Sequence, residues 1–161
     1  MKSRLTAAVA GLAMAATLGA CGGADEGPAA PSSDTFVERA DRICTQGAER
    51  LGDEVVATFG NRAPTEQEGI AFTSEVTVPM LANQIEKLRS LTPPEGESAT
   101  VSTIWDAMDD GLSTLETNPE TAFGTSDPLA EGLDLASAYG FKSCGATSPG
   151  TNTDTGTGTT P

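Results

Sequence analysis

The chain contains no histidine among its 161 residues. This absence excludes histidine-activated serine and cysteine nucleophiles, the common zinc sites and the side chain that most often transfers protons near neutral pH. The sequence also lacks a Cys-x-x-Cys motif and a glycine-rich phosphate loop of the Walker or dinucleotide-binding type. Most hydrolase mechanisms are therefore excluded, and we predict no catalytic residue, no cofactor and no metal site.

Basic residues are scarce, since nine lysines and arginines accompany 23 acidic residues. Lys2 and Arg4 lie at the start, so the rest of the chain carries seven basic and 23 acidic side chains, a net charge of −16. Nucleic acid is therefore not an expected partner, and anionic lipid headgroups would repel the chain. Calcium binding is an alternative use of the acids, but the Asp-x-Asp-x-Asp-Gly loop is absent. We interpret the acids as solvated helix faces.

The N-terminus has the pattern of an export signal. After the basic start, an uncharged run covers residues 5–20 and ends at Leu18-Gly19-Ala20-Cys21. This tetrapeptide resembles the bacterial lipobox, which implies cleavage before Cys21 and attachment of lipid to that cysteine. An uncleaved transmembrane helix is the alternative, but the run is shorter than the roughly 20 residues that a bilayer requires. We expect residues 1–20 to be a lipoprotein signal peptide and the protein to be anchored on the extracytoplasmic face of the cell membrane.

Two segments have the composition of disordered chain. Residues 21–33 contain Gly, Ala, Pro, Ser and two acids, and they lack any large apolar side chain. Residues 147–161 are rich in Thr and Gly, with the single charge of Asp154. We expect the first segment to be a flexible tether and the second an unstructured tail, with O-linked sugar on the tail as an alternative.

Apolar or small residues recur every three or four positions in residues 35–59, which predicts an amphipathic helix with Asp34 as its cap and Gly60-Asn61 as its stop. Its expected inward face consists of Phe36, Ala40, Ile43, Cys44, Gly47, Ala48, Leu51, Val55 and Phe59. Thr65-Glu66-Gln67-Glu68 is a capping box that starts a second helix. A kink or break is expected near Val76 to Pro79, because proline removes a backbone hydrogen bond.

Further signals predict two more helices. Thr92-Pro93-Pro94-Glu95 repeats the start signal, with proline in the first turn. Asn118-Pro119 ends this third helix and starts a short helical turn through Phe123. Asp127-Pro128 opens the last helix, and Gly140 supplies the left-handed residue that stops it.

The predicted fold is all-α, an up-down bundle of four helices in one domain, residues 34–146, because no run of β-branched residues alternates long enough for a strand. Three cysteines are present. With Cys21 assigned to lipid, Cys44 and Cys144 pair by elimination, and export places them where disulfides persist. We expect a disulfide that closes the bundle, with two buried free thiols as the alternative.

Two stretches carry a family resemblance. The opening Phe36-Val-Glu-Arg-Ala-Asp-Arg-Ile-Cys44 and the closing Ala138-Tyr-Gly-Phe-Lys-Ser-Cys-Gly145 resemble the ends of small exported helical proteins of high-G+C actinobacteria. The resemblance covers residues 34–146. It carries no established activity, so it implies no functional residue.

Two sets of residues are candidates for chemistry or ligand binding. Asp106, Asp109 and Asp110 lie beside Trp105 in the sequence, and glycosidases place two carboxylates roughly 5–10 Å apart beside the sugar. Trp105 and Tyr139 are alternatively candidates to line a small-molecule pocket near the expected kink. For both sets we favour a structural interpretation, a solvated acidic face and buried aromatic rings.

The function that we expect is that of a non-enzymatic module, anchored by the lipid on Cys21, that binds an envelope protein partner or an apolar ligand. Its motivation is the combination of anchor, tether and closed bundle with the lack of catalytic groups. A carboxylate-based enzyme acting on envelope polysaccharide and an acidic structural spacer are the alternatives.

Overall fold

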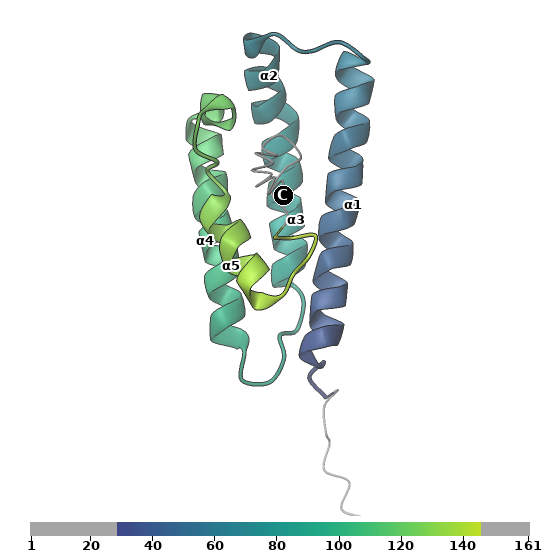
Figure 1. Cartoon of the computed structure of the whole chain (residues 1–161), viewed down its shortest axis with the longest axis vertical. Coiled ribbons are helices and arrows are strands. Elements are labelled where there is room, and N and C mark those ends of the chain that lie inside the picture. The colour runs from purple at the N-terminus through teal and green to yellow at the C-terminus, as the bar shows by residue number, and fades with distance from the viewer. Residues whose placement is uncertain (1–28, 146–161) are drawn as a thin grey trace, which may run out of the picture.

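The computed structural model of the chain describes residues 29–145, which are all-α (Figure 1). The predicted signal peptide, the predicted lipid-attachment residue Cys21, most of the predicted tether and the predicted tail lie outside the described residues. The elements are α1 (Ser33–Phe59), α2 (Glu66–Phe72), a π-helical turn η1 (Thr73–Thr77), α3 (Val78–Arg89), α4 (Ser98–Thr117), a 3₁₀ turn η2 (Pro119–Phe123) and α5 (Ala130–Tyr139). Since α2, η1 and α3 follow one another without a break, they form one helical arm. This arm, α1, α4 and α5 are the four helices of the predicted bundle, which is confirmed.

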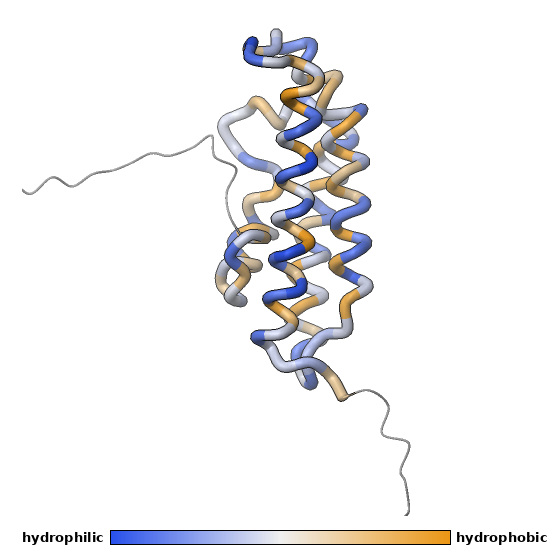
Figure 2. Tube along the Cα trace, turned by 90° about the vertical axis from the view of Figure 1, so that its right-hand side faces the viewer, coloured by the Kyte–Doolittle hydropathy of each residue, from blue (hydrophilic) through white to orange (hydrophobic). Residues whose placement is uncertain are grey.

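Three long arms, α1, α2 to α3 and α4, lie side by side along the long axis (Figure 1). The shorter α5 packs on the lower part of α4. Hydrophobic positions recur along each helix between hydrophilic ones (Figure 2). The buried apolar side chains form one core, which consists of Phe36, Ala40, Cys44, Val78, Ile85, Leu88, Val101, Ile104, Trp105, Met108, Leu112, Leu115, Ala136, Phe141 and Cys144.

The start of α1 differs from the prediction by two residues. Ser32 is the N-cap, and its hydroxyl oxygen accepts a hydrogen bond from the N–H of Thr35 at 3.3 Å. Asp34, the predicted cap, lies in the first helical turn, where its negative charge complements the helix dipole. The predicted stop is confirmed, because Gly60 has a φ of +61° and its N–H donates back to Val56.

The second arm begins with the predicted capping box, in which Thr65 and Glu68 each accept a hydrogen bond from the other's backbone N–H. The break expected near Pro79 takes the form of the π-helical turn η1. The N–H of Val78 donates to the carbonyl of Thr73, five residues back. Since proline has no N–H and its ring crowds the carbonyl four residues back, widening the preceding turn keeps the arm helical.

The predicted start of the third helix was wrong. Pro93 and Pro94 lie in a loop, and α4 begins at Ser98. A residue before proline is disfavoured in the helical conformation, and Gly96 has a φ of +79°, so the loop turns before the helix starts.

The last elements follow the sequence closely. The short turn predicted from Asn118 to Phe123 is η2. The side chain of Asp127 accepts a hydrogen bond from the N–H of Leu129 at 2.9 Å, just before α5. Gly140, with a φ of +116°, ends α5 as predicted.

The segment after α5 returns to α1 (Figure 1). There the predicted disulfide joins Cys44 to Cys144. The two Cα atoms are 5.2 Å apart, and the side chains are 5% and 3% exposed. The carboxylate of Asp41, one turn before Cys44, accepts hydrogen bonds from the backbone N–H groups of residues 142–144 at 2.7–3.2 Å. Covalent and charge-assisted bonds therefore hold the end of the domain against its first helix.

The upper part of α1 is more exposed than the sequence predicts. Val55, assigned to the inward face, is 39% exposed, and its neighbour Val56 is 63% exposed. Ala48 is exposed, and Leu51 is only partly buried. Beyond Val56 on α1, only Phe59 is buried, and its ring packs on Phe72. The helix that packs along α1 is α3, whereas α5 packs on the lower part of α4, so only one helix lies against the upper part of α1.

Within residues 29–145, no helix is both long and apolar enough to cross a membrane.

Candidate functional site

The candidate site is an open cleft between α1 and α3, with a volume of ≈ 250 Å³. Both helices line it with residues spaced by three and four, so one face of each helix forms a wall. The lining residues are Ile43, Gln46, Gly47 and Arg50 on α1, and Pro79, Met80, Asn83, Gln84 and Lys87 on α3.

Two contacts fix how the walls face each other. The rings of Phe59 and Phe72 have centroids 5.2 Å apart near the top of the molecule. Further down, Gly47 faces the side chain of Gln84. Going from Phe59 back to Gly47 takes 12 residues along α1, and going from Phe72 forward to Gln84 takes 12 residues along the arm of α2, η1 and α3. The two helices are antiparallel and in register over this length.

The floor of the cleft depends on the absence of a side chain at Gly47. A Cβ atom built at this position would lie 1.6 Å from Oε1 of Gln84. The Gln84 side chain therefore lies directly over the backbone of α1. Its Nε2 donates to Sγ of Cys44 at 3.6 Å, so the disulfide also helps to hold it.

The charges that line the cleft are both positive, Arg50 and Lys87, although the whole chain has 23 acidic and nine basic residues. In the part of the chain that the structure describes, neither side chain makes an ion pair, and the same is true of Arg39, Arg42 and Lys142. Arg50 lies three residues above Gly47, and Lys87 lies three residues below the level of Gln84. At 1.5 Å per residue, the two positions are separated by roughly 9 Å along the cleft.

The chemistry of this lining is that of binding. Guanidinium and ammonium groups donate to anions, and the carboxamides of Gln46 and Asn83 both donate and accept hydrogen bonds. None of the lining side chains is a carboxylate, thiol or hydroxyl. The cleft thus offers recognition of charge and polarity, but no group that commonly acts as a nucleophile or a general base.

The predicted carboxylates lie elsewhere, on α4. Arg89 of α3 donates to Asp106 at 2.7 Å and from its Nε to Asp109 at 3.0 Å. The hydrogen bond to Asp106, more than that to Asp109, raises the pKa of Arg89. Asp110 is exposed, and Trp105 is 2% exposed in the core. The structure therefore does not bring the aspartates together with Trp105 around a cavity.

The predicted aromatic pair does not line the cleft beside Pro79. Trp105 stacks on Phe141 with ring centroids 5.5 Å apart. Tyr139 donates from its hydroxyl to the carboxylate of Glu97, which also accepts from the hydroxyl of Ser33 at 2.7 Å. Burial and this carboxylate raise the pKa of Tyr139, and the hydrogen bond from Tyr139 lowers the pKa of Glu97. These contacts join the starts of α1 and α4 to the end of α5.

A second hollow lies near Tyr139, with a volume of ≈ 590 Å³. Its charged lining consists of Asp34, Glu38, Asp41 and Lys142. The carboxylate of Asp41 is already satisfied by backbone N–H groups. In residues 29–145, no cluster of three or more acidic or cysteine side chains is arranged to hold a metal ion.

Sequence reasoning missed the polar side of the cleft. The signal that was present is the recurrence of polar residues at matching intervals on the two helices, Gln46 and Arg50 on one, Asn83 and Lys87 on the other. Pro79, near which the sequence analysis placed an alternative small-molecule pocket, lines the cleft, but Trp105 and Tyr139 do not.

Comparisons with protein-family models, with curated proteins and with solved structures gave no match for this chain.

Proposed function

We propose that this protein is a lipid-anchored, extracytoplasmic binding module without enzymatic activity, and that the cleft between α1 and α3 is its ligand site. The observation that carries the proposal is the lining of this cleft, which combines two cations and three carboxamides with the apolar side chains of Ile43, Pro79 and Met80. Small-molecule sites use polar groups among apolar side chains to fix the orientation of a ligand. The mixed lining favours a polar ligand over the apolar ligand that we expected from the sequence.

The proposed location rests on the sequence at the N-terminus. Leu18-Gly19-Ala20-Cys21 has the lipobox pattern, and only a short stretch separates Cys21 from Ser33, where α1 begins. Two or more acyl chains make a stable anchor, whereas one alone binds a membrane only marginally. A tether of this length keeps the domain near the membrane surface.

The location is tested by expressing the tagged full-length chain in a bacterium that processes lipoproteins, together with a Cys21→Ala variant. We expect the parent protein to incorporate an alkyne-bearing fatty acid and to sediment with the membrane fraction. The variant should incorporate none. A parent protein that remains unlabelled, or a variant labelled equally well, contradicts the proposal.

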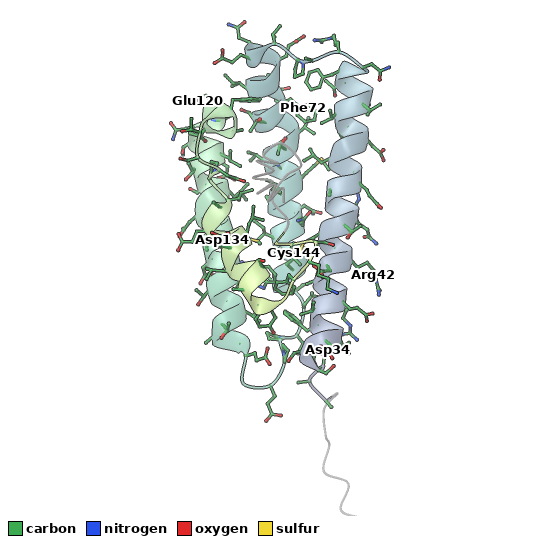
Figure 3. The ribbon with its side chains drawn as sticks, in the orientation of Figure 1. Asp34, Arg42, Phe72, Glu120, Asp134 and Cys144 are labelled. Atoms are coloured by element: carbon green, nitrogen blue, oxygen red, sulfur yellow. A yellow bond between two sulfur atoms is a disulfide. The ribbon has the colours of Figure 1, made fainter. Side chains whose placement is uncertain are left out.

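A protein partner is the second candidate, and the exposed apolar residues Val55 and Val56 on α1 favour it. Photo-crosslinking in cells from position 56 tests this candidate, with position 42 as the matched control. Arg42 lies on the same helix and points away from the other helices (Figure 3). One protein captured from position 56 and not from position 42 supports a partner. Identical patterns from both positions argue against it.

The carboxylate enzyme is the weaker alternative, because Arg89 pairs with both Asp106 and Asp109. Replacing both aspartates with asparagine should leave cell-wall glycan turnover unchanged.

A further inference from the structure

We propose that the α1–α3 cleft binds a small, elongated dianion, in which two anionic groups at opposite ends are joined by a spacer that carries hydroxyl or amide groups. This inference rests on the proposed binding function and names the ligand class of the same cleft. The juxtaposition that carries it is Arg50 at one end of the cleft, Lys87 at the other and carboxamides between them.

The two cations are placed to be neutralised by a ligand. Neither makes an ion pair within residues 29–145. Arg39, Arg42 and Lys142 also make no ion pair, so what distinguishes Arg50 and Lys87 is that both line one cleft. They are the only charged residues in its lining, and this lining favours a small anion.

The separation of the cations selects the shape of the ligand. Their positions differ by roughly 9 Å along the antiparallel walls, since six residues of helix rise separate them. Both side chains are long and flexible, so each can bend toward a ligand in the middle of the cleft. A molecule with a single anionic group satisfies one cation fully, whereas a linear dianion satisfies both.

The middle of the cleft selects the spacer. Gln46 and Asn83 line the part between the cations, with donors and acceptors for hydroxyl or amide groups. Gln84, beneath them, is held over Gly47 and hydrogen-bonded to Cys44. The volume of ≈ 250 Å³ is below the range of roughly 300–1,000 Å³ for sites of drug-sized ligands. The ligand must therefore be a small molecule.

The test uses the full-length lipoprotein, purified in neutral detergent, and a series of linear dicarboxylates of increasing length from succinate to sebacate. Affinities are measured by calorimetry and by NMR shifts of the lining residues. We expect affinity to pass through a maximum at an intermediate length, with the monocarboxylate of that length binding roughly tenfold more weakly. Galactarate should bind more tightly than adipate, which has the same carbon chain without hydroxyl groups.

Variants identify the groups responsible. Arg50→Gln and Lys87→Gln should each reduce the affinity for the best dicarboxylate to that of its monocarboxylate, a loss of roughly tenfold. The matched control, Arg42→Gln, removes the same charge from α1 outside the cleft and should leave the affinity unchanged. Far-ultraviolet circular dichroism confirms that all three variants fold.

Three results overturn the inference: no dicarboxylate binds at millimolar concentration, affinity does not depend on length, or Arg42→Gln weakens binding as much as Arg50→Gln. These results leave the proposed location intact, because the Cys21→Ala fractionation measures it separately. Conversely, a protein that is not lipidated but binds dicarboxylates with the expected length dependence refutes the location and retains the ligand site.

Discussion

Gly47 and Gln84 are predicted to be energetically coupled across the cleft. Replacing a glycine in a helix interior with alanine stabilises the helix by roughly 1 kcal/mol. At position 47 the new Cβ meets Oε1 and Cδ of Gln84 at 1.6 and 2.7 Å, so the Gln84 side chain must leave its place. We take the total cost of displacing it, including the loss of its long hydrogen bond to Cys44, as about 1 kcal/mol. Gly47→Ala alone should therefore leave the free energy of unfolding nearly unchanged.

Removing the obstruction should reveal the helix effect. In a Gln84→Ala background, Gly47→Ala should stabilise the protein by about 1 kcal/mol, which gives a coupling free energy of about 1 kcal/mol for the pair. Gly52 on the same helix is the control, because a Cβ at this position meets nothing within 4 Å. Gly52→Ala should stabilise both backgrounds equally.

The assay is urea unfolding of the four variants of the cycle and the two controls, followed by circular dichroism and analysed by linear extrapolation. The reasoning is refuted if Gly47→Ala stabilises the parent protein as much as Gly52→Ala does. It is also refuted if the effects at positions 47 and 84 are additive.

Three other predictions concern the stability of the fold. The disulfide closes a loop of 100 residues, so replacing Cys44 and Cys144 with alanine should destabilise the domain by up to about 4.7 kcal/mol in urea, and a loss below 1 kcal/mol would contradict a closed loop. Asp41→Asn weakens hydrogen bonds from three backbone N–H groups and should cost about 2 kcal/mol, with faster amide hydrogen exchange after α5; unchanged exchange would refute this role. The hydrogen bonds from its partner arginine and from the helix cap lower the pKa of Glu68 from 4.5 to about 2. The stability that these contacts supply is therefore fully present above about pH 4.5 and is lost as the pH falls toward 2. Glu68→Gln should make the free energy of unfolding depend less steeply on pH in this range. Parallel pH profiles for the parent protein and the variant would count against the ion pair.

The helix ends that the sequence predicted correctly depend on local chemistry. The capping box at Thr65 and the left-handed glycines Gly60 and Gly140 act within a few residues of their own positions. Local chemistry did not determine which residue caps α1, because Ser32 and Asp34 are both favourable N-cap residues. The proline pair at residues 93–94 was misread, because a start signal in the sequence also fits a loop that turns at Gly96.

The candidate site was harder to predict, because it forms only where two helices, α1 and α3, pack side by side. Gln46 and Arg50, viewed on α1 alone, are indistinguishable from a solvated helix face. They become one wall of a cleft only when α3 packs beside α1 and supplies Asn83 and Lys87 to the opposite wall. The exposure of Val55 was missed for a similar reason, because periodicity identifies an apolar face but not which helices pack against it.

The bond between Cys44 and Cys144 also determines what happens when the chain is cut. A protease that cleaves once anywhere between these cysteines produces two polypeptides that remain covalently joined. The loop at Gly60 to Pro64 and the segment from Gly124 to Asp127 are exposed connections of the kind that proteases attack first. A cut in either would leave both walls of the cleft attached to the part of the chain that precedes α1. At the proposed extracytoplasmic location, where a cleaved peptide bond is not repaired, a domain cut once would therefore remain in one covalently joined piece.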